Sequence, residues 1–455
     1  MLIFLRVVAL IILILHGASY FLSAGWWGVS PYAVFPPILG WGLLLLAATT
    51  LLPQQNRRWR QMLASGWRRI PGKTHPRRWF ALVAIAAAPI FWLLRIRHLQ
   101  WGDAQILVIG LSQKDAPVLY NWQAPFTVFL HQRLWQLLAY PRWGWGVDTV
   151  YAAVSVLCGV VFVFVVLIWA HAMGQSTAER VLLAGVVFTG GGMQLFFGYV
   201  ENYTIISLGV MLFLYFGWRV LQNETPLWVA SAVLALTNAF HPSTVVLWVA
   251  MAYLVWRKWQ AGLSVWELLQ AVLLPPLLVG SVVLSLMEIG NHGLAAFLGD
   301  DRPGGGDHVW FVPLSLAAPT EWQRYAMFSA AHFADWGNEM LLTAPLGIFA
   351  LAGVPILWKR LQQSNARIRT ALEFFALAAF GYLLLTWVWN ADYGMQKDWD
   401  LFSPASITVN VLAGVLWVTL LRGDDEAMGE SALIVWAVAG LHTLAWVLSN
   451  ARFFG

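Results

Sequence analysis

The chain has 455 residues, of which 60% are hydrophobic and only 11% are charged, and its mean hydropathy of +0.66 lies far outside the range of soluble proteins. The net charge of +5 does not indicate a nucleic-acid partner, because the basic residues follow a membrane topology. The single cysteine, Cys158, excludes an internal disulfide framework and a multi-thiolate metal site.

Apolar runs recur along the whole chain, many of them long enough to cross a hydrocarbon core of about 30 Å as helices. They predict an all-α, polytopic transmembrane bundle of about thirteen spans with interfacial helices in the outside loops. The first run lacks a small-residue cleavage site after it, which indicates a retained helix rather than a signal peptide. The predicted spans are 3–22, 32–52, 80–95, 149–172, 181–198, 204–221, 227–240, 243–257, 265–288, 340–358, 371–389, 402–421 and 432–450.

The segment 53–79 contains eight Arg and Lys residues and no acid, which predicts a cytoplasmic loop. Alternating the spans from this loop puts the N-terminus inside, the C-terminus outside, and 14 of the 22 acids outside. We therefore expect two N-terminal spans plus the basic loop in 1–79. The transmembrane core follows in 80–455, with long outside loops at 96–147 and 289–339.

Both long outside loops contain predicted surface helices. Pro125 suits a first helical turn, and apolar residues recur at helical spacing through 124–138, with His131 and Gln132 among the polar residues on the other side. This pattern predicts a helix lying in the membrane interface. A second surface helix is expected near 320–337, after the glycines 304–306.

The spans 227–240 and 243–257 are short and are separated by His241-Pro242. Proline cannot continue the helical hydrogen bonds and pushes its neighbour out of helical geometry. We expect two short helices meeting at His241, with its side chain facing a cavity or the outer leaflet boundary rather than lipid. A packing role for this histidine is the alternative.

Six of the 14 outside acids gather in four short clusters, which predicts a polar reaction or binding site at that membrane surface. The clusters are Trp101-Gly102-Asp103, Gly198-Tyr199-Val200-Glu201-Asn202, Gly299-Asp300-Asp301 and Lys397-Asp398-Trp399-Asp400.

Asp103 and Glu201 each have two interpretations. The Asp103 carboxylate, at the water boundary, can accept a proton from an attacking hydroxyl, or it can cap a helix that begins at Ala104. Glu201 lies in a tight turn and either points into a protein cavity or caps the span that starts near Tyr203.

In the fourth cluster, Lys397 can hold a phosphate, Asp398 or Asp400 can bind a sugar hydroxyl, and Trp399 offers a stacking face. The alternative is an aromatic-belt loop whose acids favour a helix N-terminus.

These motifs resemble those of the polytopic GT-C glycosyltransferases, the superfamily of protein O-mannosyltransferases, aminoarabinose transferases and bacterial relatives. The similarity covers roughly 80–451. It rests on the Asp103 motif in a first long outside loop, a following interfacial helix, the paired short spans at Phe240-His241-Pro242, and the Glu201 and Lys397 motifs. Ala104 stands where the superfamily usually has a second acid, so a partner acid must come from elsewhere, for which Glu201 is the candidate.

The resemblance implies transfer of a sugar from a polyprenyl-phosphate carrier to an acceptor glycan, lipid or protein at the outer face of a bacterial plasma membrane. Asp103 would be the general base, and Arg97, His98, Lys397 or His241 would bind the departing phosphate. No metal ligand is assigned, and dependence on a divalent metal is left open. The alternatives are a transporter or flippase for a lipid-linked or anionic substrate, and an assembly subunit of an envelope complex.

Overall fold

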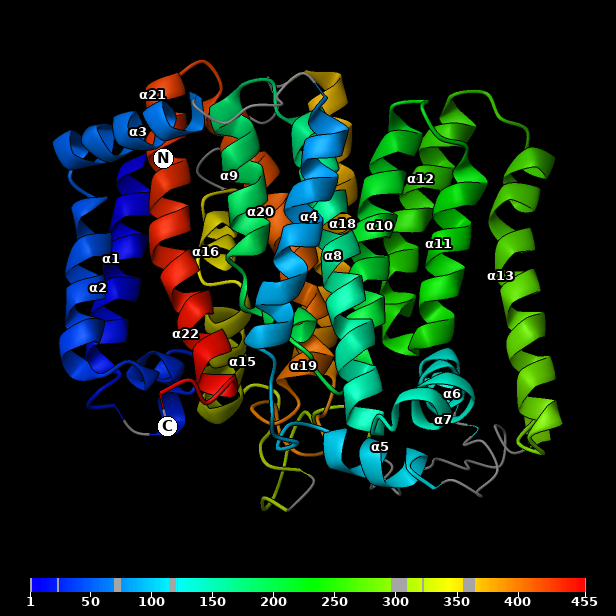
Figure 1. The fold of residues 1–455 in the computed structure, drawn as a ribbon. Coiled ribbons are helices and arrows are strands. Elements are labelled where there is room, and N and C mark those ends of the chain that lie inside the picture. Colours follow the sequence, from blue (N-terminus) through cyan, green and yellow to red (C-terminus); the bar gives the residue numbers. More distant parts are fainter. Residues whose placement is uncertain are drawn as a thin grey trace.

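The computed structural model describes residues 2–22, 24–68, 75–113, 120, 122–295, 309–320, 323–354 and 365–454. Across these residues the chain forms helices, and its only β-type pairing is an isolated bridge between Phe311 and Trp389. The long helices run side by side as a bundle (Figure 1). The predicted all-α transmembrane architecture is confirmed.

Each of the thirteen predicted spans contains helix. Within the described residues, six stretches are long and apolar enough to cross a membrane on their own: α8, α10, α13, α18, α19 with α20, and α21 with α22. A π-helical turn, Val435–Ala439, joins α21 to α22. The bundle helices are α1 (Leu2–Ala18), α2 (Pro37–Thr49), α4 (Pro76–Leu93), α8 (Val147–Met173), α9 (Thr177–Phe188), α10 (Tyr203–Leu221), α11 (Leu227–Phe240), α12 (Trp248–Gln260), α13 (Val265–Ile289), α15 (Ala330–Thr343), α16 (Gly347–Ala352), α18 (Ala366–Val388), α19 (Trp399–Phe402), α20 (Pro404–Leu421), α21 (Asp425–Ile434) and α22 (Gly440–Asn450).

Two predicted spans are broken helices. The span 181–198 consists of α9 and a 3₁₀ turn, Gly191–Phe196, and the span 340–358 is interrupted between α15 and α16. The two breaks pack against each other, because a Cβ atom on Gly191 would lie 2.0 Å from the carbonyl oxygen of Leu342. The prediction of continuous helices was wrong here, because Gly190, Gly191 and Gly192 lie in one break and Pro345 lies in the other, and both residue types disfavour a continuous helix.

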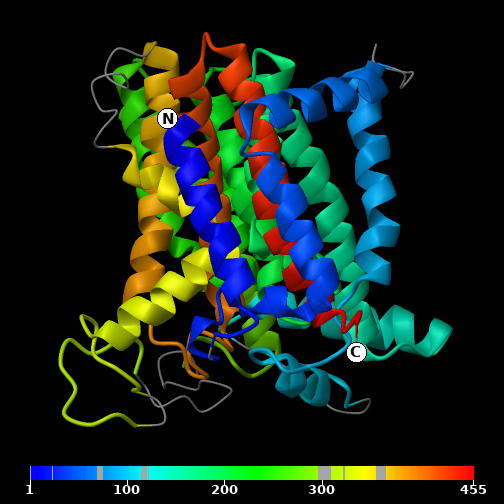
Figure 2. The same ribbon diagram turned by 90° about the vertical axis from the view of Figure 1, so that its left-hand side faces the viewer.

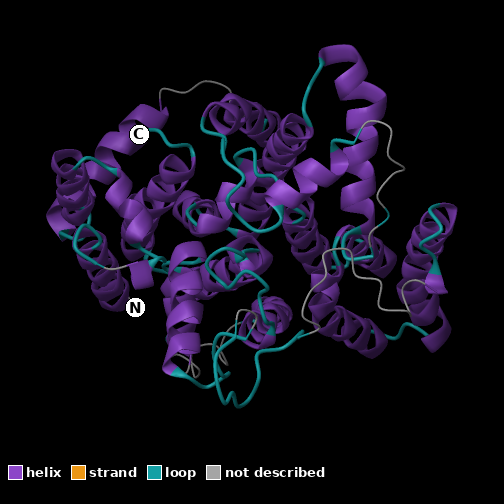
Figure 3. Cartoon of the chain, turned by 90° about the horizontal axis from the view of Figure 1, so that it is seen from below, coloured by secondary structure: helices purple, strands orange, loops and turns teal. Residues whose placement is uncertain are grey.

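The two ends of the bundle differ. After α2 the chain bends by 95° into α3 (Pro53–Arg68), which lies across one end near α21 (Figures 1 and 2). The helices α5 (Ala104–Leu111), α6 (Pro125–Leu134) and α7 (Tyr140–Trp143) lie at the other end, which Figure 3 shows from below. The termini lie at opposite ends, as an odd number of crossings predicts.

The helix α6 lies across the bundle end, as expected of an interfacial helix, but its polar side faces inward. His131 and Gln132 are buried, whereas Leu137, in the π-helical turn that follows, is 72% exposed. The His131 ring stacks on Tyr151 of α8 with centroids 3.7 Å apart, and His131 Nδ1–H donates to Thr127 O at 2.7 Å. These two polar side chains therefore find their partners inside the protein.

The second surface helix, expected near 320–337, is α15 and begins at Ala330 instead. Ser329 caps it, because its side chain accepts a hydrogen bond from His332 N–H. The cluster around Asp300 and Asp301, and the glycines 304–306, lie outside the described residues.

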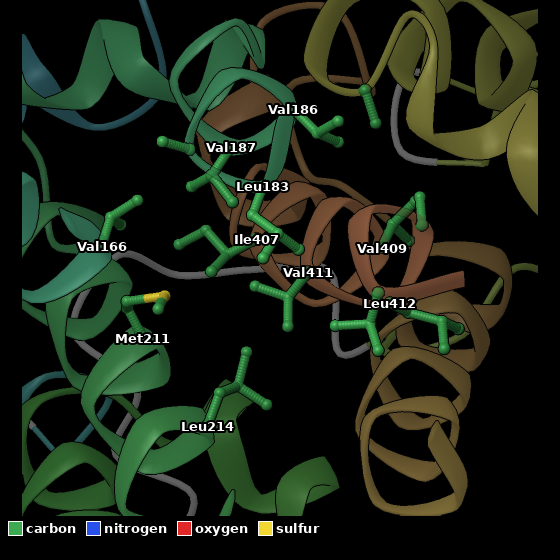
Figure 4. Close-up of a cluster of buried hydrophobic side chains, with 14 of the residues drawn as sticks. Val166, Leu183, Val186, Val187, Met211, Leu214, Ile407, Val409, Val411 and Leu412 are labelled. Carbon is green, nitrogen blue, oxygen red and sulfur yellow. The ribbon is translucent and has the colours of Figure 1, made fainter. Parts of the chain in front are cut away.

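The centre of the bundle is a packed apolar core in which α8, α9, α10 and α20 meet (Figure 4). Val166, Leu183, Leu214 and Val411, one from each helix, are buried there. Because lipid tails are themselves apolar, close packing rather than water exclusion holds such helices together. This core fixes the positions of the loops before α10 and before α19, which carry two of the acid clusters.

Candidate active site

Three loops meet at the bundle end that carries α5. They connect α4 to α5 (94–103), lead into α10 (197–202) and lead into α19 (389–398). Ile96 N–H donates to Phe197 O at 2.9 Å, and Gly102 N–H donates to Lys397 O at 3.0 Å. These backbone hydrogen bonds bring three of the four predicted acid clusters together, although they lie far apart in the sequence.

Gly102 allows the carboxylates to approach the first loop closely. Its φ of +47° is in the left-handed region, which side chains other than glycine rarely adopt. A Cβ atom placed on it would lie 2.6 Å from Glu201 Oε1 and 3.4 Å from Asp400 Oδ2. Both acids therefore flank the same backbone position, one residue before Asp103.

Asp103 stands at the N-cap position of α5, but its side chain accepts no capping hydrogen bond. The Tyr393 hydroxyl hydrogen-bonds to the Asp103 carboxylate instead. The side chain is half-buried; burial raises the pKa of Asp103, and the hydrogen bond from Tyr393 opposes that rise. The capping alternative is therefore wrong, and the geometry suits a carboxylate that accepts a proton.

Glu201 is buried and points into the protein, as predicted. Its Oε1 accepts a hydrogen bond from Asp103 N–H, and its Oε2 accepts one from Asn202 N–H at 2.9 Å. Burial, together with the charges of Asp400 and Asp103, raises the pKa of Glu201 well above its usual value, although these two backbone donors lower it. Glu201 thus holds the backbone of Asp103 in place.

Asp398 and Asp400 complete the group of acids. Asp398 Oδ2 accepts a hydrogen bond from Tyr393 N–H at 2.8 Å, and burial raises the pKa of Asp398 to about 8. Asp400 Oδ1 accepts from Leu401 N–H at 3.1 Å, while its Oδ2 has no hydrogen-bond partner among the described residues. Both side chains are buried, so Asp103 is the one member of this group of four that is partly exposed.

Four tyrosines surround these acids and were not predicted as site residues. Burial, followed by the charges of Asp400 and Glu201, raises the pKa of Tyr199, whose ring packs edge-on against Trp399 at 5.3 Å. Three of the tyrosines lie inside or beside the acid motifs, so the sequence offered a signal for them; the one on α8 had none. The four are Tyr151, Tyr199, Tyr203 and Tyr393.

His241 lies where the two short helices meet, as predicted, and it is buried. Its Nδ1 accepts a hydrogen bond from Ser243 N–H at 3.2 Å, which leaves the proton of a neutral ring on Nε2. That Nε2 is buried without a hydrogen-bond partner in the described part of the chain, and the ring lies 4.9 Å from that of Tyr203. Burial lowers the pKa of His241 to about 3, so this side chain is a neutral donor rather than a cation.

The predicted phosphate-binding residues occupy different places. The side chains of Arg97 and Lys397 are exposed. Lys397 adjoins the acids through its carbonyl, which accepts from Gly102 N–H. His98 is half-buried, hydrogen-bonds to Asn450 and thus lies toward the end of α22 rather than among the acids.

A metal site does not emerge from the acids. Within the described ranges, no group of three His, Cys, Asp or Glu side chains has an arrangement suited to holding a metal ion. Glu201 Oε1 and Oε2 are both occupied by backbone N–H groups, which leaves them poorly placed as metal ligands.

The fold resembles a solved structure of ArnT from Cupriavidus metallidurans bound to undecaprenyl phosphate. The TM-score is 0.53 at 13% sequence identity, and the match covers 82% of this chain and 77% of that chain. The apo state of the same protein gives a TM-score of 0.47 at 13% identity, over 86% and 78% of the two chains. At this identity the likeness shows the fold alone, and it confirms the expected GT-C-like fold class, a polytopic helical bundle. No protein-family model and no curated protein matches the chain.

Proposed function

We propose that this protein is an integral-membrane glycosyltransferase that moves a sugar from a polyprenyl-phosphate carrier to an acceptor at the membrane face carrying Asp103. The observation that carries the proposal is the convergence of four acids from three loops and the start of α19, with Asp103 partly exposed and free of a capping role. The fold neighbour bound to undecaprenyl phosphate supports a lipid-phosphate donor.

In the proposed reaction, Asp103 accepts the proton of the acceptor hydroxyl or amine as that group attacks the anomeric carbon. A new bond from the acceptor to the anomeric carbon forms, the bond from that carbon to the phosphate oxygen breaks, and the polyprenyl phosphate leaves with the electron pair. Attack opposite the departing phosphate inverts the anomeric configuration. The raised pKa of Asp103 makes it a stronger base than an exposed aspartate.

The other acids support this step. Glu201 fixes the Asp103 backbone, and the free Asp400 Oδ2 and the nearby Asp398 offer acceptors for sugar hydroxyls. Lys397, exposed beside the acids, is the best-placed cation for the phosphate, and His241 Nε2–H can donate a hydrogen bond. Arg97 and His98 remain candidates at the edge of the first loop.

A membrane catalyst of this size suits a donor whose isoprenoid tail stays in the bilayer while its phosphate reaches the polar loops. The acceptor is a glycan, lipid or protein, and we place the enzyme in a bacterial plasma membrane with these loops outside. The charge pattern of 53–79 supports that orientation.

The test is a reconstitution into sealed liposomes with polyprenyl-phosphate sugars and a panel of acceptors. We expect transfer of the sugar to an acceptor on the side of the α5 end, with loss of the lipid-linked donor. Movement of intact donor across the bilayer without transfer would replace the proposal by the flippase alternative.

A further inference from the structure

The end of the bundle opposite the acids carries the helix α3, which lies flat instead of crossing the membrane. It follows α2 after a bend of 95°, at Pro53, and runs across the end of the bundle (Figures 1 and 2). Proline at a first helical turn both ends the preceding helix and starts the new one. Pro53 therefore suits the corner between α2 and α3.

The first half of α3 is anchored on the protein. Asn56 is fully buried, and its Nδ2 donates to Thr50 O at 2.8 Å. Arg57 forms an ion pair with Glu426 of α21, and Trp59 Nε1 donates to Thr49 Oγ1 at 3.0 Å. These contacts hold α3 at the level where α2 ends.

The second half of α3 extends beyond these contacts with apolar side chains uncovered. Met62 and Leu63 are each 61% exposed. At 100° per residue they fall on the same side of the helix as Trp59, whereas Gln61 falls on the opposite side. Trp59, Met62 and Leu63 thus form an apolar stripe along α3. Such a stripe at the level of a membrane surface is typical of a helix that lies among the lipid headgroups.

Positive charge surrounds this stripe. The helix contains no acid, and Arg58 is exposed on it. Arg77 and Arg78, also exposed, lie in the first turn of α4, which begins at the same end of the bundle. None of these three arginines forms an ion pair within the described residues. Their charge is complementary to a phosphate headgroup.

We propose that α3 and the start of α4 form an anionic-lipid binding surface. Leu63 and Met62 insert into the leaflet, and Arg58, Arg77 and Arg78 bind the phosphates of anionic phospholipids. This inference is independent of the proposed transferase activity, because it concerns the opposite membrane face.

The first test measures lipid binding to the whole protein. Wild type and Arg58→Gln/Arg77→Gln are titrated with phosphatidylglycerol in detergent and bound lipids are counted by native mass spectrometry. Each basic residue near an anionic surface contributes about fivefold in affinity, so the double variant should bind phosphatidylglycerol about 25-fold more weakly, with phosphatidylcholine unaffected. The matched control is Arg142→Gln/Arg452→Gln, two exposed arginines at the other end of the bundle. Equal affinity in the wild type and both double variants would overturn the proposal.

The second test locates the apolar stripe. Two variants, Leu63→Cys and Gln61→Cys, are made in a Cys158→Ala background, and each is labelled with an environment-sensitive fluorophore. The labelled proteins are placed in nanodiscs that contain phosphatidylglycerol. We expect iodide to quench the label at position 61 and to spare the one at position 63. Equal quenching of the labels at positions 61 and 63 in nanodiscs would contradict lipid insertion. If the label at position 63 is then protected from iodide only in native membranes, a protein partner covers this side of α3 instead of lipid.

Discussion

At the residue scale, Gly102 combines a left-handed backbone conformation with close contact to the Glu201 carboxylate. We expect Gly102→Ala to reduce glycosyl transfer at least about tenfold, because a methyl group there displaces the Glu201 carboxylate that holds Asp103. The left-handed backbone adds a cost of about 1–2 kcal/mol in unfolding free energy.

Gly144→Ala is the matched control, because Gly144 has a φ of +65° and open space where an added Cβ atom would stand. It should show the backbone cost in a thermal unfolding curve and keep its transfer activity. Equal activity in the two variants would show that the contact between Gly102 and Glu201 does not matter for function.

The raised pKa of Asp398 predicts how the stability of the protein changes with pH. Its pKa is about 8 in the folded protein against 3.8 for an unperturbed aspartate, so the folded chain binds this proton more tightly. The protonated Asp398 side chain makes its full contribution to stability below about pH 4, and this contribution is lost as the pH rises through about 8. The free energy of unfolding then falls by no more than about 1.4 kcal/mol per pH unit. We expect the unfolding temperature of Asp398→Asn in detergent to fall less between about pH 5 and pH 9 than that of wild type. Asp425→Asn, an exposed acid, serves as the control, and parallel curves for wild type and Asp398→Asn would contradict the assignment.

The sequence identified the acids of this site but not its surroundings. Asp103, Glu201, Asp398 and Asp400 stood out because acids are rare in so apolar a chain and these lie in short polar motifs. Tyr151 could not be predicted, because it faces the acids from an apolar helix, and only packing brings it there.

At the element scale, hydropathy predicted where helices occur but not where they break. The residues on both sides of each break are apolar, but Gly190, Gly191 and Gly192 lie in the first break and Pro345 lies in the second, and these residues disfavour a continuous helix. Hydropathy alone does not register these residues, and the contact between Gly191 and the Leu342 backbone depends on tertiary structure.

The contact at Gly191 can be tested. Gly191→Ala should lower the unfolding free energy by about 1–3 kcal/mol, because the new Cβ would overlap the Leu342 carbonyl. Gly280→Ala, in α13 with open space around its Cβ, should leave stability unchanged or raise it slightly. Thermal unfolding in detergent compares the two, and equal melting temperatures would contradict the packing of the two breaks.

At the scale of the whole molecule, the charge pattern separated the two ends of the bundle correctly. The basic residues of 53–68 and the acids of the three loops lie at opposite ends. Which end faces the cytoplasm stays a prediction from positive charge, since the fold alone has no inside or outside.

Cysteine labelling with a membrane-impermeant reagent decides the orientation. Ser65 on α3 and Gln113 after α5 are both exposed, which makes them suitable positions. In intact cells of a Cys158→Ala background, we expect Gln113→Cys to be labelled and Ser65→Cys to react only after the membrane is opened. The reverse pattern would invert the topology and place the acids in the cytoplasm.

The central claim is that Asp103 is the general base of a glycosyl transfer, and the transfer rate of Asp103→Asn tests it most directly. Asparagine keeps the size of the side chain but cannot take up the proton, so the rate should fall about 100- to 10,000-fold. The unfolding curve should stay close to that of wild type, because the Asp103 side chain caps no helix. A stable Asp103→Asn protein that transfers sugar from a polyprenyl-phosphate donor at the wild-type rate would contradict this role.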